Sequence, residues 1–430
     1  NMPTAPLRLG IAGLGTVGVG VLKMLYKNAE MLSIRTGRQI TVSAVSAKSK
    51  SKDRGVDLGN ITWEDNPVVL AQREDVDVFV ELIGGSEGIA KDAAEAAIAA
   101  GKDIVTANKA MLAIHGQSLA LAAEKTDCVI RFEAAVAGGI PVVKALTEGL
   151  AGNKINRVLG VMNGSCNYIL TRMETAGLTY EQVFAEADSL GYLEKDPNLD
   201  VGGIDAGHKL ALLASIAFGT EIDFNNVVLE GIGSITIEDI HAAADMGFRV
   251  KLLGVAQMTG RGLEQRMTPC LVPASSPLAQ LEGGTNMVIL EGGDSGTIVL
   301  RGAGAGAGPT ASAVMSDIID IARGLRLKTF GQPASSLVRA QPATATTPAP
   351  FYLRLQLLDK PGAMAKITSV MGDAGVSIDR MRQYGHAAGQ APVLIVTHKT
   401  TRAAIDQVLS DFTSTGVVEG IMVALRIEML

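Results

Sequence analysis

A glycine-rich turn after the first apolar segment constrains the fold of this chain more than any other feature. Residues 7–12 (LRLGIA) predict a short buried strand, and residues 13–18 read GLGTVG. In a strand–turn–helix unit the first glycine allows the turn, the second lets a pyrophosphate approach, and the third lets the helix pack closely. The first N–H groups of that helix can hold phosphates. The motif predicts a dinucleotide-binding site with contacts from Gly13, Gly15, Thr16, Val17 and Gly18.

The end of the second predicted strand, residues 39–46, bears on the choice of cofactor. A site that prefers NAD usually has an acidic residue there, which binds the ribose hydroxyls. This chain instead has four cations within residues 47–54 (AKSKSKDR), the first of them Lys48. Such a segment suits a 2′-phosphate, so we expect NADP rather than NAD. A solvated basic loop is the alternative, because the sequence does not say which cation reaches the phosphate.

Three further buried strands are predicted at residues 76–83, 103–107 and 128–133. Ligands in open α/β sheets bind beyond the carboxyl ends of the strands. Lys109 follows the second of these strands, so we expect it at the ligand site rather than on an unrelated surface. Glu133 ends the third strand, and the main-chain carbonyls after it could join Glu133 around a hard cation, which prefers oxygen ligands.

Residues 187–210 carry more carboxylates than the surrounding apolar chain. A predicted helix there places Asp205 and Lys209 four residues apart and therefore on one face. The helix continues as LALLASIAF, which predicts burial. A lysine entering a buried helix needs a partner or a function. A solvated acidic loop is the alternative, and we take the Asp205/Lys209 pair as a candidate site.

Composition limits the class of protein. The chain has 430 residues, 47% hydrophobic and 19% charged, which is typical of a globular protein of two to four domains with buried sheets. A net charge of −6 and only 4% aromatic residues argue against nucleic-acid binding. No long uncharged apolar run and no signal-peptide pattern is present, so no membrane association is expected. Three scattered cysteines suggest a reducing cytoplasm.

The chain divides into three predicted parts. Residues 1–140 form the dinucleotide-binding domain, to which a helix at about residues 309–328 returns. Residues 141–308 predict an α+β domain with a mixed or antiparallel sheet. Residues 331–350 are a Pro/Ala/Thr-rich linker, and residues 351–430 follow the ferredoxin-like order βαββαβ. The strands expected in the second domain lie at residues 157–162, 226–235, 263–271, 286–291 and 297–301.

In its motifs the chain resembles homoserine dehydrogenase, in the form with a C-terminal ACT regulatory domain. The motifs keep the family's order: GLGTVG (13–18), TANKA (106–110), EAAVAGGIP (133–141), NGSCNYIL (163–170), LGYLEKDPNLDVGGIDAGHKL (190–210), GAGAGAGPT (302–310) and the ACT-like DKPGAMAKI (359–367). The resemblance implies an α/β protein with a Rossmann-type dinucleotide-binding domain, an α+β substrate and dimerisation domain, and a ferredoxin-like ACT domain. It implies NAD(P)-dependent, reversible reduction of L-aspartate 4-semialdehyde to L-homoserine in threonine, methionine and isoleucine biosynthesis.

The resemblance also implies roles for single residues. Lys209 becomes the acid–base group at the substrate oxygen, Asp205 its orienting partner, and Lys109 a group between cofactor and substrate. Glu194 would hold the substrate's amino group. The other implied contacts are Asp200, Asn163, Gly164 and Tyr192 for the substrate, and Gly306 for the nicotinamide half of the cofactor. A loop for a sodium or potassium ion would contain Glu133 and the main-chain oxygens of Val136, Gly138 and Ile140.

Two departures from the family pattern and two other functions bear on this interpretation. Ser165 and Cys166 stand where the family usually has threonines, and Leu193 and Lys195 replace small residues beside Glu194. None of these four is an expected catalytic group. The alternatives are another Rossmann dehydrogenase acting on a small amino acid or semialdehyde, and a non-catalytic amino-acid sensor.

The ACT-like segment predicts regulation. L-threonine is the expected effector, because it is the pathway's end product; serine or methionine could take its place, or the segment could only dimerise. The effector would bind near Gly375, Val376, Ile378 and Gln383. Exposed sheet edges in the second and third domains predict a homo-oligomer, either a dimer or a tetramer.

Overall fold

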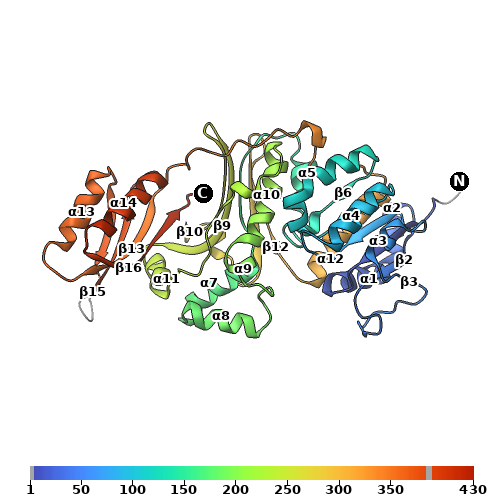
Figure 1. Ribbon diagram of the computed structural model, residues 1–430, viewed down its shortest axis with the longest axis horizontal. Helices are drawn as coiled ribbons and strands as arrows, with labels where there is room; N and C mark the ends of the chain where they lie inside the picture. Colours follow the sequence, from blue (N-terminus) through green and yellow to red (C-terminus); the bar gives the residue numbers. More distant parts are fainter. Residues whose placement is uncertain (1–3, 384–389) are drawn as a thin grey trace.

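The computed structural model describes residues 4–383 and 390–430 and arranges them in three modules along one long axis (Figure 1). An N-terminal module lies at one end, a C-terminal module at the other, and a middle module between them. The C-terminus lies near the middle of the molecule, beside β10 (Gly262–Pro273). No helix of the described residues is long and apolar enough to span a membrane.

The N-terminal module is a parallel sheet of six strands, which confirms the predicted Rossmann-type domain. The strand order is β3-β2-β1-β4-β5-β6, and such sheets bind nucleotides where the order reverses, beside β1. The strands are β1 (Leu7–Ala12), β2 (Ile40–Ser46), β3 (Thr62–Trp63), β4 (Val78–Glu81), β5 (Asp103–Thr106) and β6 (Ile130–Arg131). The helices are α1 (Thr16–Lys27), α2 (Ala29–Thr36), α3 (Pro67–Gln72), α4 (Ile89–Ala99) and α5 (Lys109–Lys125).

A helix from much later in the chain completes this module. α12 (Ala307–Ala322) packs against α1, so closely that a Cβ on Gly20 would lie 3.1 Å from the Ala307 oxygen. It begins and ends somewhat earlier than the returning helix expected at residues 309–328. The glycine segment before α12 therefore connects the middle module to the N-terminal module.

The middle module is built on a mixed sheet. Its strands are β7 (Ile155–Val161), β8 (Val228–Leu229), β9 (Phe248–Thr259), β10, β11 (Thr285–Gly292) and β12 (Gly296–Ala303). Its helices are α6 (Val142–Lys144), α7 (Gly164–Ala176), α8 (Tyr180–Ser189), α9 (Asn198–Val201), α10 (Ile204–Phe218) and α11 (Ile237–Asp245). The strand predicted at residues 226–235 was wrong beyond the two residues of β8, since Gly231 and Gly233 interrupt it and Thr236 then caps α11.

The C-terminal module confirms the predicted βαββαβ order. It contains β13 (Phe351–Leu358), α13 (Ala363–Asp373), β14 (Ile378–Gln383), β15 (Gln390–Thr397), α14 (Arg402–Ser414) and β16 (Val418–Ile427). Its strands lie in the order β16-β13-β15-β14, so β14 is its outer edge. The residues expected to hold an effector lie at this edge: Gly375 and Val376 just before β14, and Ile378 and Gln383 at its two ends.

The middle and C-terminal modules share one sheet. β16 pairs in parallel with β10, with Cys270 opposite Arg426 and Leu271 opposite Ile427, so ten strands form a single sheet. The edge of the middle module at β10 and the edge of the C-terminal module at β16 therefore pair with each other within one chain. Residues 331–350 are not a free linker either, because Val338 exchanges main-chain hydrogen bonds with Gly219 and Glu221.

Candidate active site

Two helices meet at Asp205, whose carboxylate binds two lysines. Asp205 and Lys209 lie one turn apart on α10, and Lys109 is the first residue of α5. Asp205 Oδ1 lies 2.8 Å from Lys109 Nζ, and its Oδ2 lies 3.1 Å from Lys209 Nζ. Lys209 Nζ also donates to the main-chain oxygen of Met162 at 2.8 Å. The two lysines that the sequence singled out separately therefore lie at one point.

Glycines set the limits of α10. Gly203 precedes it with a φ of +82°, a conformation that favours glycine, and Asp205 then lies in the first helical turn. A carboxylate there interacts favourably with the helix dipole. The helix continues with buried apolar residues and stops at Gly219, which has a φ of +66°. The buried part fixes the helix, so its polar first turn is held at the edge of the core.

Burial and charge act in opposite directions on the pKa values of this cluster. Burial alone would raise the pKa of Asp205, but Lys209 and Lys109 hold it well below its usual range. Burial alone would lower the pKa of Lys109, but Asp205, with Glu194 and Asp200 further away, raises it above its ordinary value. Asp205 is therefore a carboxylate and Lys109 an ammonium group near neutral pH.

Asn163 connects this cluster to the loop before α10. Its Nδ2 donates to Asp200 Oδ1 at 3.1 Å and to Asp205 Oδ2 at 3.4 Å. Its Oδ1 accepts from the main-chain N of Cys166 at 2.8 Å and so caps α7. Asp200 Oδ2 accepts from the main-chain N of Glu194 at 2.7 Å. These bonds order the loop beside the lysines and leave the Glu194 side chain exposed.

The other expected substrate residues line the same loop. Tyr192 is 51% exposed, and its ring lies edge-on to Tyr168 with centroids 5.0 Å apart. Gly164 begins α7 against the main chain of Gly284, where a Cβ would lie 3.2 Å from the Gly284 oxygen. This close approach leaves little room for a side chain at position 164.

Ser165 and Cys166, which stand where the family usually has threonines, both make hydrogen bonds to the main chain of residues 192–200. Ser165 Oγ donates to the main-chain oxygen of Tyr192 at 2.6 Å. The Cys166 thiol donates to the main-chain oxygen of Asp200 at 3.2 Å, and burial raises the pKa of that thiol. Cys166 is therefore a weak donor to the loop before α10 rather than a nucleophile.

A cavity of about 810 Å³ lies over the glycine motif and the end of β2. Gly13 has a φ of +101°, and a Cβ there would lie 2.5 Å from the Leu82 oxygen. A Cβ on Gly18 would lie 2.0 Å from the Gly13 oxygen, so both glycines are required by close packing. Gly15 precedes α1, and no side chain caps the helix that Thr16 and Val17 begin. The cavity is lined by Gly13, Gly15, Lys48, Lys52 and Arg54, among others.

Two buried polar residues near the strand ends were missed by the sequence analysis. Glu81, at the end of β4, accepts from the main-chain N of Ile83 and Gly84, each at 2.9 Å, and from the Thr106 hydroxyl at 2.6 Å. It therefore organises two strand-end loops. A lone glutamate inside the apolar run VDVFVELI was the available signal. The second residue, Asn286, is 1% exposed, and its amide has no partner among the described residues.

The expected cation loop lies between β6 and α6. Gly138 has a φ of +57°, and a Cβ there would lie 2.4 Å from the Gly304 carbonyl carbon, so the loop packs directly on the glycine segment before Gly306. The Glu133 carboxylate accepts from the main-chain N of Val143 at 2.8 Å and of Lys144 at 3.3 Å. Burial, and then the nearby Asp317, raise the pKa of Glu133 to about 7.

The main-chain oxygens of this loop differ in their partners. Within the described residues the Val136 and Gly138 oxygens accept no hydrogen bond, whereas the Ile140 oxygen accepts from Val142 at 2.8 Å and the Glu133 oxygen from Val136 at 3.3 Å. No group of three or more acidic, histidine or cysteine side chains suited to a metal occurs in the described part of the chain. A cation here would therefore depend on main-chain oxygens.

Comparison with known proteins gives one consistent family. The family model for homoserine dehydrogenase matches residues 141–319, and the model for the homoserine dehydrogenase NAD-binding domain matches residues 13–133. The model for the ACT domain matches residues 351–415. The homoserine dehydrogenase of Neisseria gonorrhoeae is 42% identical over 433 residues, covering 99% of both chains.

Solved structures agree. A homoserine dehydrogenase from Thiobacillus denitrificans superposes with a TM-score of 0.93 at 38% identity, covering 99% of this chain and 98% of that one. A hyperthermophilic archaeal homoserine dehydrogenase in complex with NADPH has a TM-score of 0.63 at 26% identity. It covers 73% of this chain and 97% of its own.

Proposed function

The chain belongs to the homoserine dehydrogenase family of NAD(P)-dependent oxidoreductases acting on a CH–OH group, and on this premise we propose that Lys209 is its acid–base residue. Its reaction is the reversible reduction of L-aspartate 4-semialdehyde to L-homoserine, with Asp205 and Lys109 completing the catalytic group. The observation that carries the assignment is the Asp205 carboxylate between two lysine ammonium groups, 2.8 Å and 3.1 Å away.

The chemistry required at the substrate suits this arrangement. Reduction of an aldehyde builds negative charge on its oxygen, which a positioned ammonium group stabilises and protonates. Lys209 has three N–H donors; Met162 and Asp205 take two, and the third remains for the substrate oxygen. In the oxidative direction Lys209 accepts the hydroxyl proton, and because the oxidation releases a proton overall, alkaline pH should favour it. Lys109 adds fixed positive charge beside the reacting group.

The loop before α10 is proposed to hold the substrate's amino-acid end. Glu194 would bind the ammonium group, with its main chain fixed by Asp200. Asn163 and Gly164 would line the same pocket from the start of α7, and Tyr192 would cover it from the loop. The support is the set of hydrogen bonds by which Asn163 joins Asp200 to Asp205.

The glycine-rich turn at residues 13–18 fits a dinucleotide, and we propose NADP as the preferred one. When bound, the nicotinamide supplies or accepts the hydride, while the protein contributes position and charge. Lys48, Lys52 and Arg54 all line the cavity at the end of β2, where a 2′-phosphate would need cations. Gly306, the residue before α12, is proposed to contact the nicotinamide half, because it is exposed and stands at the N-terminus of the helix that packs on α1.

A monovalent cation, sodium or potassium, is also proposed. The Val136 and Gly138 oxygens would bind it, since they accept no hydrogen bond in the described residues, and Ile140 and Glu133 would complete the loop. The ion would hold residues 133–140 against the glycine segment that carries Gly306. Its role is therefore structural support of the cofactor side of the site.

The domain content, the sheet edges and the cysteines support our proposals on regulation, assembly and cellular location. The ACT domain supports an amino-acid effector, and we propose L-threonine, the end product of the pathway in which homoserine leads to threonine, methionine and isoleucine. β12 and β14 end the ten-stranded sheet, and such edges favour assembly into a dimer or tetramer. Three free, buried cysteines fit a reducing cytoplasm.

The decisive experiment compares homoserine oxidation by the wild type and Lys209→Ala at alkaline pH, with NADP and NAD in parallel. We expect kcat to fall at least about 100-fold in the variant, as for loss of a general acid–base group. The Kd for NADPH, measured by fluorescence, should stay unchanged and serves as the folding control. A variant that keeps its activity would contradict the role of Lys209, and a wild type inactive with both cofactors would contradict the substrate.

A further inference from the structure

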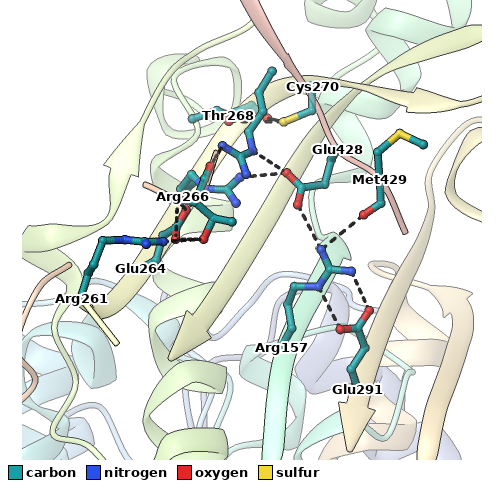
Figure 2. Close-up of polar contacts among 11 residues, drawn as sticks. Arg157, Arg261, Glu264, Arg266, Thr268, Cys270, Glu291, Glu428 and Met429 are labelled. Carbon is teal, nitrogen blue, oxygen red and sulfur yellow. Dashed lines mark hydrogen bonds and ion pairs between the residues drawn. The ribbon is translucent and has the colours of Figure 1, made fainter. Parts of the chain in front are cut away.

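Buried charges join the C-terminal module to the middle sheet (Figure 2). Glu428, which follows β16, is 4% exposed and stands between arginines of two other strands. Its Oε1 accepts from Arg157 Nη1 at 3.1 Å, and its Oε2 accepts from Arg266 Nη1 at 3.2 Å and from Arg426 Nε at 2.7 Å. One carboxylate of the C-terminal module therefore holds both β7, through Arg157, and β10, through Arg266.

The rest of this cluster balances the charges. Arg157 makes two hydrogen bonds to Glu291 on β11, at 3.0 Å and 2.7 Å, and Arg266 Nε donates to Glu264 at 2.9 Å. Three arginines thus face three glutamates. Burial alone would raise the pKa of Glu428, but Arg266 and Arg426 lower it, so Glu428 is charged at neutral pH.

β7 leads from this cluster to the catalytic group. Arg157 lies near the start of β7, and the strand is paired on both sides, with β9 and β11. The residue after β7 is Met162, whose oxygen accepts from Lys209 Nζ at 2.8 Å. Asn163 follows and donates to Asp205. A shift of β7 along its axis would move both partners of the acid–base group.

β10 reaches the same group from the other side. Met267, next to Arg266, packs beside Gly203, where a Cβ would lie 3.6 Å from Met267 Cγ. Gly203 is the residue before α10, the helix of Asp205 and Lys209. Glu428 therefore binds two strands that each contact a support of Lys209: β7 ends beside Met162, and β10 packs on Gly203 through Met267.

We propose that Glu428 and Arg157 are positioning residues for Lys209, fixing β7 and with it the Met162 oxygen that orients the lysine ammonium group. The inference rests on the proposed role of Lys209 and extends it to residues outside the active site. It also gives any ligand of the C-terminal module a route to the acid–base group through the shared sheet.

The test compares Glu428→Gln with a matched control, Asp239→Asn. Asp239 on α11 is also a buried carboxylate at the contact with the C-terminal module, where it accepts from Tyr352 Oη at 2.7 Å and Arg354 Nε at 2.6 Å. Among the described residues its side-chain hydrogen bonds and ion pair go to Thr236, Tyr352 and Arg354, none of which lies on β7 or β10. We expect kcat for homoserine oxidation to fall about tenfold in Glu428→Gln, because small misplacements of catalytic groups are costly. In Asp239→Asn it should stay within about twofold, and the NADPH Kd should be unchanged in both.

A second variant separates positioning from folding. Arg157→Lys keeps the charge but removes the planar guanidinium whose Nε and Nη2 bind Glu291 while Nη1 binds Glu428, so it should show the same loss of kcat even if Glu428→Gln does not fold. The double variant should lose no more than the more severe single one, as expected for residues acting through one contact. Equal losses in Glu428→Gln and Asp239→Asn, additive losses, or wild-type kcat in both Glu428→Gln and Arg157→Lys would overturn the proposal.

All assays are run without threonine, so the outcome is independent of the effector. Lys209→Ala, measured alongside, tests the proposed function separately. An active Lys209→Ala enzyme would contradict the proposed function, whereas an inactive one with an unaffected Glu428→Gln would contradict only the positioning role.

Discussion

At the scale of residues, Glu133 is a carboxyl group whose protonation affects stability. Its pKa is raised from 4.5 to about 7 by burial and by Asp317. Because the folded state binds this proton more tightly than the unfolded state, its contribution is complete below about pH 4.5 and is lost as pH rises through about 7. The free energy of unfolding should therefore decrease across this window, by up to about 3 kcal/mol from this group alone.

Glu133→Gln, which cannot ionise, provides the comparison. Urea unfolding of both proteins at pH 5, 6, 7 and 8, without added sodium or potassium, should show the wild type losing stability relative to the variant as pH rises. A sodium or potassium ion bound at residues 133–140 would favour the carboxylate and reduce this slope. Parallel pH dependence in the two proteins would contradict the raised pKa.

The residues of the site were predictable to different degrees. Asp205 and Lys209 could be found because a spacing of four in a buried helix is visible in sequence, and Lys109 because it follows a predicted strand. Met162 could not be found, since it acts through a main-chain oxygen that any residue possesses. Glu81 was missed because the apolar run around it predicted only a buried strand, although its carboxylate organises two loops.

At the scale of elements, Asn163 caps α7, which begins at the next residue, and donates to the carboxylates of Asp200 and Asp205. Asn163→Ala should cost about 1 kcal/mol as a lost cap. It should also lower kcat/KM for homoserine about tenfold or more, because Asp200 and Asp205 lose their shared donor. Steady-state kinetics and thermal unfolding measure the two effects.

Thr179→Ala is the matched control for that prediction. Thr179 caps α8 by accepting from the main-chain N of Gln182, and among the described residues its side chain makes no hydrogen bond to Asp200, Asp205 or Lys209. It should lose similar stability without losing activity. If both variants lose the same activity, the cap alone explains the effect and Asn163 has no separate role in the site.

Helices and strands whose apolar residues recur with one clear period were predicted well, whereas the long strand β9 was not. β9, which pairs with β10 over twelve residues, was missed. Both of its faces are buried, so its sequence, FRVKLLGVAQMT, lacks the alternation that marks a half-exposed strand, and it includes the buried Lys251. The Rossmann strands were also apolar, but the glycine motif fixed their context.

At the scale of the whole molecule, the C-terminal module is part of the middle sheet rather than an appendage. Deleting residues 351–430 would open the edge of β10 and remove Glu428 from Arg157 and Arg266. Breaking a buried ion pair typically costs about 3–5 kcal/mol. We therefore expect the truncated chain to unfold at a lower temperature and to aggregate, as measured by calorimetry and size-exclusion chromatography. A truncated enzyme with the full-length unfolding temperature would contradict this.

The junction could not be predicted from sequence. The three domains are each visible through local patterns, but the pairing of β16 with β10 joins segments far apart in the chain and leaves no local signal. Residues 331–350 looked like a flexible linker because of their Pro, Ala and Thr content. Their hydrogen bonds to the middle module depend on neighbours that only the fold brings together.

The shared sheet also dictates the order in which the protein can assemble during its synthesis. β10 is made long before β16, so the part of its edge at Cys270 and Leu271 stays open until residues 418–427 have been synthesised. Open edges recruit other strands, and slow non-local pairing prolongs the exposure. The N-terminal module is likewise incomplete until α12 has been synthesised and can pack against α1. We therefore expect translation speed and chaperone supply to affect the yield of folded protein.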